Sequence, residues 1–141
     1  MSFWDSSGLV PLCTNEPRSI LAGKFWKRFP TIFVWWETSV EISSALARLE
    51  RENKISLAQR LKAEKRLATL EKIWEEIQPS ARVKELARTF PALHGLKTAD
   101  SLQLAAALVW CKENPKGRDF VSGDEKLIKV AVAVGFTAHI L

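Results

Sequence analysis

Cysteine and histidine are scarce in this chain of 141 residues, which has two of each. Cys13 and Cys111 stand alone with no CxxC pair, so neither a disulfide framework nor a zinc site is expected. His94 and His139 are equally isolated, whereas metal-binding histidines normally come with spaced partners. We therefore expect two buried or half-buried thiols, and histidines with structural or surface roles.

Long apolar runs are also missing. None approaches the roughly 18 residues that a membrane span requires, and the N-terminus begins with strand-like sequence rather than a basic segment and an apolar core. We therefore expect a cytoplasmic protein without a membrane partner. Hydrophobic residues make up 47% of the chain and charged residues 26%, as in ordinary globular proteins. One domain over residues 1–141 is expected.

The net charge is +5, from 21 Lys and Arg residues against 16 Asp and Glu residues. A basic surface favours a polyanionic partner such as RNA through phosphate contacts. It also keeps a protein soluble, so charge alone does not separate these two explanations.

Hydrophobic patterning predicts strands alternating with helices. Apolar or β-branched runs at 2–4, 31–35, 120–123 and 136–141 are typical of strands. Periodicity and helix-end signals predict helices from residue 5 or 6, over 18–28, around 42–49, and over 57–77, 81–93, 100–113 and 125–134. No strand is expected between Trp74 and Pro79. The pattern predicts an α/β fold with a mainly parallel central sheet, helices on both faces and an extra hairpin of the two central helices.

Four carboxylates stand where a strand-like run gives way to a helix: Asp5, Glu41, Asp100 and Asp124. In a parallel sheet these junctions open on one edge, where such folds bind ligands, so we expect the acids to converge. They would repel one another unless a cation held them, and helix N-termini are expected to keep them ionised. No thiolate or imidazole accompanies them, so an all-oxygen site for Mg²⁺ or Mn²⁺ is predicted.

Each acid also has a structural explanation, because Asp is a preferred N-cap and any carboxylate is favoured in the first turn of a helix. The explanation is strongest for Glu41, since Thr38 and Glu41 have the spacing of a capping box. Glu37 ranks second to Glu41 at that corner. Asp119 is an internal control: an extended strand would place it about 16 Å from Asp124, at the opposite end of the sheet.

Four motifs carry a resemblance to a known family: WDSSGLV, TSVEISSALAR, HGLKTADSLQLAAAL and FVSGDEKL. Their order and spacing resemble the PIN-domain ribonucleases, particularly the VapC-type toxins of toxin–antitoxin pairs. The likeness covers essentially the whole chain, and the third motif is its most specific part. Two features depart from the family pattern: Trp35-Trp36 before the second motif, and the missing strand between Trp74 and Pro79.

The resemblance implies a PIN-like α/β/α sandwich and an Mg²⁺- or Mn²⁺-dependent endoribonuclease. Asp5 and Asp100 would be direct metal ligands, and Glu41 and Asp124 would complete the pocket. By the same likeness, two serines would line the pocket, Ser6 and Ser122. The implied partners are an RNA substrate, a VapB-type antitoxin and a second copy of the chain in a homodimer.

Two other functions stay open. One is a PIN-domain nuclease that acts in RNA maturation without an antitoxin. The other is a receiver-like signalling module, which also groups acids at the edge of a parallel sheet. That module needs paired acids near the first strand and a late lysine at a strand end, and both are missing here.

Overall fold

A parallel five-stranded sheet forms the centre of the structure, a computed structural model that describes residues 1–141. The strands are β1 (Ser2–Trp4), β2 (Ile32–Trp35), β3 (Glu75–Ile77), β4 (Asp119–Ser122) and β5 (Thr137–Ile140). Their order is β3-β2-β1-β4-β5, and every pairing is parallel. The chain therefore builds outward from β1 to one side and then to the other. Such a reversal, here between β1 and β4, opens a crevice at the carboxyl ends of the strands.

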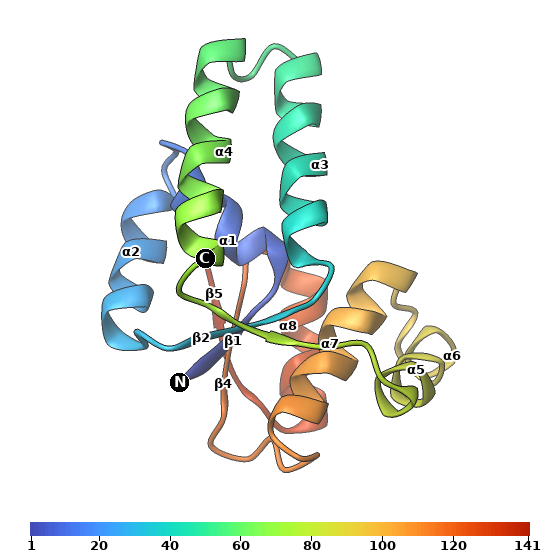
Figure 1. The fold of residues 1–141 in the computed structure, drawn as a ribbon. Helices are drawn as coiled ribbons and strands as arrows, with labels where there is room; N and C mark the ends of the chain where they lie inside the picture. The colour runs from blue at the N-terminus through green and yellow to red at the C-terminus, as the bar shows by residue number, and fades with distance from the viewer.

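Eight helices cover the two faces of this sheet (Figure 1). One layer holds α1 (Ser6–Cys13), α2 (Ser19–Arg28), α3 (Thr38–Arg51) and α4 (Leu57–Glu71). The other holds α5 (Ala81–Ala87), α6 (Phe90–His94), α7 (Thr98–Trp110) and α8 (Glu125–Val134). The predicted α/β sandwich is thus confirmed. None of these helices combines the length and apolar character needed to cross a membrane.

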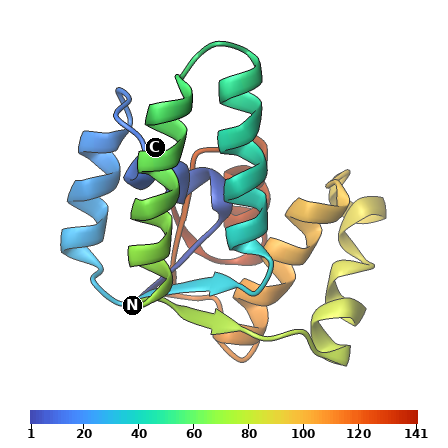
Figure 2. The same ribbon diagram turned by 45° about the horizontal axis from the view of Figure 1, so that its top comes forward.

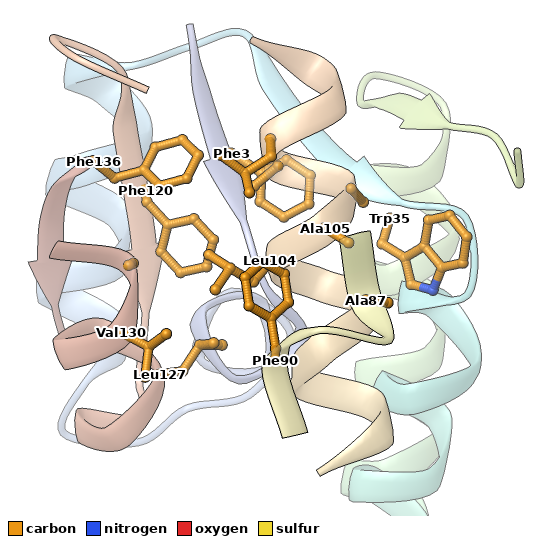
Figure 3. Close-up of a cluster of buried hydrophobic side chains, with 14 of the residues drawn as sticks. Phe3, Trp35, Ala87, Phe90, Leu104, Ala105, Phe120, Leu127, Val130 and Phe136 are labelled. Carbon is orange, nitrogen blue, oxygen red and sulfur yellow. The ribbon is translucent and has the colours of Figure 1, made fainter. Parts of the chain in front are cut away.

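Each strand contributes side chains to both layers, because successive residues of a strand point to opposite faces. Phe3 and Phe120 lie in the core beneath α7 and α8, where their ring centroids are 5.7 Å apart (Figure 3). Trp4 and Val121 lie in the opposite core, against α1 and α3. Burial on both faces explains why these strands appear in the sequence as continuous apolar runs.

The pair α3 and α4 forms the predicted helical hairpin, which extends well beyond the sheet (Figures 1 and 2). Ser56 begins α4 through a capping box: its hydroxyl accepts from the Gln59 amide at 3.1 Å, and the Gln59 side chain accepts from the Ser56 amide at 2.7 Å. Between the helices, Ser43 donates to Glu64 at 3.1 Å. These contacts hold the hairpin as one unit beside the site described below.

The end of α4 differs from the sequence prediction. The helix stops at Glu71 rather than near Ile77, and residues Glu75–Ile77 form β3, a strand that the sequence analysis did not expect. β3 pairs with β2 at the edge of the sheet and keeps its side chains half-buried or exposed. An edge strand with so little burial has no apolar alternation, so backbone pairing rather than pattern determines it.

The helix predicted over 81–93 is divided into α5 and α6. Pro91 lies in the first turn of α6, where a missing backbone N–H is tolerated, and this favours a new helix start over continuation of α5. Gly95 ends α6 with φ of 65°, a left-handed conformation that glycine adopts without strain. The helix end predicted there is confirmed.

Candidate active site

The four carboxylates lie at the carboxyl edge of the sheet, each on a different helix. Asp5 directly follows β1 and caps α1, and Asp124 caps α8 shortly after β4. Glu41 and Asp100 lie in the first turns of α3 and α7. Burial is the largest cause of the raised pKa of both Glu41 and Asp100. The charge of Asp100 adds to the effect on Glu41, and the charge of Asp124 adds to the effect on Asp100, so these three acids are close enough to interact.

Asp5 is almost completely buried, with 3% of its surface exposed. Its carboxylate accepts from the Ser7 hydroxyl at 2.9 Å to each oxygen and from the Gly8 amide at 3.1 Å. Burial raises its pKa to about 7, although these hydrogen bonds oppose the change. Desolvation outweighs the hydrogen bonds to the charged form, although the Gly8 and Ser7 amides at the start of α1 do lower the pKa, as expected of a helix N-terminus.

A serine network connects Asp5 to the β4–α8 junction. The Ser7 hydroxyl accepts from the Gly123 amide at 2.9 Å and lies 3.1 Å from the Ser122 hydroxyl, which accepts from the Asp124 amide at 3.0 Å. Ser122 is fully buried, so it supports Asp5 from beneath. Sequence reasoning missed Ser7, which contacts Asp5 two positions away and also Ser122 and Gly123, more than a hundred positions away in the chain.

The close approach of α1 to β4 depends on Gly8. A Cβ added there would lie 3.1 Å from the carbonyl oxygen of Val121, closer than ordinary van der Waals contact. This glycine lets the helix that follows Asp5 rest directly on the strand that leads to Asp124.

Glu41 is held by a hydrogen bond to each of its carboxylate oxygens. Ser6 donates to Oε2 at 3.0 Å, and the Gln103 amide donates to Oε1 at 2.8 Å and to the Thr38 hydroxyl at 3.1 Å. The capping box that the Thr38–Glu41 spacing suggested does not form, because Glu37 takes the N-cap position and no side chain caps the helix. The capping-box explanation for Glu41 is therefore wrong, although Glu41 does lie in the first turn of α3, where a carboxylate is favoured.

Burial is also the main cause of the raised pKa of Glu41. The negative charges of Glu37 and Asp100 raise this pKa further. Glu37 thus lies at the same corner, as expected from its position one turn before Glu41. Gln103, which sequence reasoning missed, lies on α7 one turn after Asp100 and is itself fully buried. The same face of α7 therefore provides one acid and the amide that orients another.

Asp100 differs from the other acids because its carboxylate accepts no hydrogen bond from a protein group. The N-cap of α7 is Lys97, which makes no side-chain cap, so Asp100 is not a capping residue. Burial and the charge of Asp124 raise its pKa, and Lys126 and Lys97 oppose this effect. A half-buried carboxylate beside other acids, with its oxygens free, is suited to bind a cation.

Asp124 serves the fold as well as the acidic corner. Its Oδ1 accepts from the Leu127 amide at 3.0 Å and so caps α8. Asp119 lies at the other end of β4, where its carboxylate is 2.7 Å from the His139 ring. The control residue is therefore outside the acidic corner, as predicted.

The donor set at this corner consists of oxygens. No three side chains of the kinds that bind metals are close enough, as they stand, to form a complete ligand set. Carboxylate oxygens fit a hard cation such as Mg²⁺ or Mn²⁺. Cys13 lies at the end of α1, the helix that Asp5 caps. It is buried in the apolar core, and this burial raises the pKa of its thiol to about 12. Thiolate ligation is therefore disfavoured.

Comparisons with known proteins give relatives in sequence and in fold. No protein-family model matches the chain. Two curated ribonucleases from Mycobacterium tuberculosis, VapC45 of strain CDC 1551 and VapC49 of strain H37Rv, are each 29% identical to it over 113 residues, covering 75% of this chain and 74% of theirs. The resemblance to VapC-type PIN-domain ribonucleases is confirmed.

Solved structures share the fold of this chain. Mycobacterium tuberculosis VapC20, a sarcin-ricin loop cleaving toxin, matches with a TM-score of 0.68 at 17% identity, over 97% of both chains. A toxin–antitoxin complex from Klebsiella pneumoniae matches with a TM-score of 0.65 at 15% identity, over 100% of both chains.

One of the two departures from the VapC pattern disappears in the structure, since β3 occupies the place of the strand thought to be missing. The tryptophan pair remains. Trp35 is buried, whereas Trp36 is 51% exposed and directly precedes Glu37. The VapC-like chain therefore has an exposed aromatic side chain close in sequence to its acidic corner.

Proposed function

We propose that this protein is an Mg²⁺- or Mn²⁺-dependent endoribonuclease and the toxin of a toxin–antitoxin pair. The observation that carries the metal site is Asp100, a half-buried carboxylate that no protein donor satisfies and that lies near Glu41 and Asp124. The likeness to ribonucleases VapC45 and VapC49 supports the nuclease activity. The likeness to a toxin–antitoxin complex supports the protein partner.

In this proposal Asp5 and Asp100 hold the cation directly, and Glu41 and Asp124 complete its environment. A divalent cation bound there neutralises charge on the phosphoryl oxygens, stabilises the leaving oxygen and makes a water molecule more acidic. Glu41 is suited to orient the attacking water, because Ser6 and Gln103 fix both of its oxygens. Ser7 likewise fixes both carboxylate oxygens of Asp5, which holds this carboxylate in the corner.

The protonation of these acids governs the first step. Because burial raises the pKa of Asp5, Glu41 and Asp100, protons compete with the cation for the same oxygens. Asp5, with a pKa of about 7, is the acid at which this competition is expected near neutral pH. RNA cleavage is therefore expected to require a pH near or above neutrality.

Replacement of Asp100 by Asn tests the metal site. The amide keeps the size of the side chain but removes the charge, so Asp100→Asn is expected to fold normally and to lose metal-dependent RNA cleavage. Asp119→Asn is the matched control, since it makes the same chemical change at the opposite end of β4. Cleavage at nearly the wild-type rate in Asp100→Asn, or equal loss in both variants, would contradict the proposed site.

A further inference from the structure

An open cavity leads away from the acidic corner between α1 and α3. It has a volume of about 600 Å³ and is lined near the carboxylates by Ser6, Ser7 and Glu41. Its walls continue along α3 to Arg48 and Leu49. Seven residues separate Glu41 from Arg48, so the groove follows two helical turns, or about 10 Å, from the site.

A second cavity continues the first. Its volume is about 210 Å³, and it lies between the end of α1 and the turn of the α3–α4 hairpin. The two cavities are adjacent, because Glu16 and Leu49 line both of them. We call these two cavities together, from Glu41 through Arg48 to the hairpin turn, the α3 track.

The charge of the α3 track changes sign along its length. Glu37 and Glu41 line the end near the site, and Glu16 lines both cavities. At the far end, Lys54, Lys62 and Arg66 outnumber this one acid. Arg66 is held in place by hydrogen bonds to the Cys13 carbonyl oxygen at 3.3 Å and to the Asn15 side chain at 3.2 Å. The far end is therefore a cationic cavity with one of its charges fixed by the fold.

Most of these cations are free to bind an anion. Arg48 and Lys62 are exposed and form no ion pair. The only acidic partner of Lys54 is Glu52, at 3.2 Å, and with 66% and 46% of their side chains exposed this pair contributes little. A polyanion entering the α3 track would thus meet positive groups that are not already neutralised.

We propose that the α3 track holds the backbone of single-stranded RNA on one side of the scissile phosphate. This inference rests on the proposed function, because it states along which surface the RNA substrate of that site would lie. A phosphodiester chain carries a negative charge at regular intervals. Phosphates of one chain could therefore contact the lysine and arginine side chains at the far end and the metal ion proposed at the near end. The track has no aromatic residue in its lining, so the contacts are with phosphates and tolerate any base sequence.

Equilibrium binding without cleavage tests the α3 track. We would titrate the full chain against a labelled, mixed-sequence single-stranded RNA in EDTA and measure the dissociation constant at several salt concentrations. The test variant is Lys54→Gln with Lys62→Gln, two exposed changes outside the acidic corner. Lys112→Gln with Lys129→Gln is the control, since it removes the same charge from exposed positions on and near α7 and α8.

The test variant is expected to bind about fivefold to tenfold more weakly, and each phosphate that it no longer binds should reduce the slope of the salt dependence by about 0.7. The control pair is expected to bind like the wild type. Equal weakening in both variants, or none in the test variant, overturns the proposal. Displacement of the RNA by a polyglutamate peptide at the same charge concentration would also overturn it, by assigning the track to an acidic protein segment.

Cleavage assays with Mn²⁺ keep this inference separate from the proposed function. If the wild type cleaves RNA, the test variant is expected to raise KM with kcat unchanged, because the track binds substrate and transition state equally. An unchanged KM overturns the track and leaves the nuclease standing. Selective loss of RNA binding in a protein that cleaves no RNA supports the track and contradicts the proposed nuclease.

Discussion

The side-chain amide of Gln103 donates to Oε1 of Glu41 over 2.8 Å and so joins α7 to α3 at the edge of the sheet. A carboxylate on a helix surface ordinarily turns among several rotamers, but this one is held from both sides, by Gln103 and by Ser6. The position of Glu41 therefore depends on a residue of the helix that also holds Asp100.

Replacement of Gln103 by Leu is expected to lower the free energy of unfolding by about 1–3 kcal/mol, because Thr38 and Glu41 lose a buried donor. A double-mutant cycle with Glu41→Ala, followed by urea denaturation, should show a coupling energy of about 0.5–3 kcal/mol. The control cycle combines Gln103→Leu with Asp119→Asn, two residues that do not touch. A coupling as large in the control cycle would mean that Gln103 does not act through Glu41.

The pH dependence of stability follows from Asp5. Its pKa in the folded protein, about 7, is above the ordinary aspartate value of 3.8, so folding favours the neutral form. Stability from this group is fully present below about pH 4 and is lost as the pH rises through 7, by up to about 4 kcal/mol. Glu41 and Asp100 act in the same direction, because their pKa values are also raised.

Denaturation in EDTA should therefore show that the stabilisation by these neutral carboxyl groups decreases as the pH rises from the acid range through neutrality. The side chain of Asn does not titrate, so in Asp5→Asn the free energy of unfolding should decrease less with rising pH than in the wild type. A variant with the same pH dependence as the wild type would rule out Asp5 as its source.

Mn²⁺ is expected to raise the melting temperature, because a cation that binds only the folded acidic corner stabilises it by mass action. The increase should be larger at slightly alkaline than at mildly acidic pH, since protons compete for the same carboxylates. Zn²⁺ at the same concentration should stabilise less, because the corner has no thiolate or imidazole ligand. Asp100→Asn should abolish the Mn²⁺ effect, and an equal increase in that variant would place the ion elsewhere.

The glycines of α1 and α2 make a matched pair for packing. Gly8→Ala is expected to destabilise the protein by about 1–3 kcal/mol, because the new methyl group would press α1 away from β4. Gly23→Ala in α2 meets no atom within 4 Å and should stabilise the helix by about 0.5–1 kcal/mol. Melting temperatures that move in the same direction in both variants would contradict the packing explanation.

Co-expression with a small neighbouring gene distinguishes a toxin from an RNA-maturation nuclease. As a toxin, the protein should arrest growth alone, form a stable complex with the product of that gene, and lose its RNA cleavage in the complex. If the protein cleaves RNA but neither binds the product of that gene nor is inhibited by it, it would be assigned to RNA maturation.

The sequence predicted the positions of Asp5, Glu41 and Asp124 because strand-to-helix junctions are local features. The prediction is wrong for Asp100, which lies at the junction of α6 and α7 rather than after a strand. Asp5 and Asp124 each follow a recognisable apolar run, and parallel pairing brings such ends together. The residues that support the acids were not predicted. Ser7 depends on a strand that lies far along the chain, and Gln103 resembles a surface residue until α3 is placed against α7.

The secondary structure was missed where burial was low. β3 has no apolar alternation, since it pairs on one side only and its first residue, Glu75, faces solvent. α5 and α6 form separate helices within one periodic segment, which Pro91 divides. Periodicity reports burial, so it fails where backbone pairing or a single proline determines the structure.

The strand order has a consequence for synthesis of the protein on the ribosome. β1 is synthesised first and pairs with β2 and with β4, which is synthesised much later. Asp5 is supported by Ser122 and Gly123 through Ser7. A nascent chain that ends before β4 lacks both this support and Asp124. An unfinished chain that lacks β4 therefore cannot form the complete acidic corner.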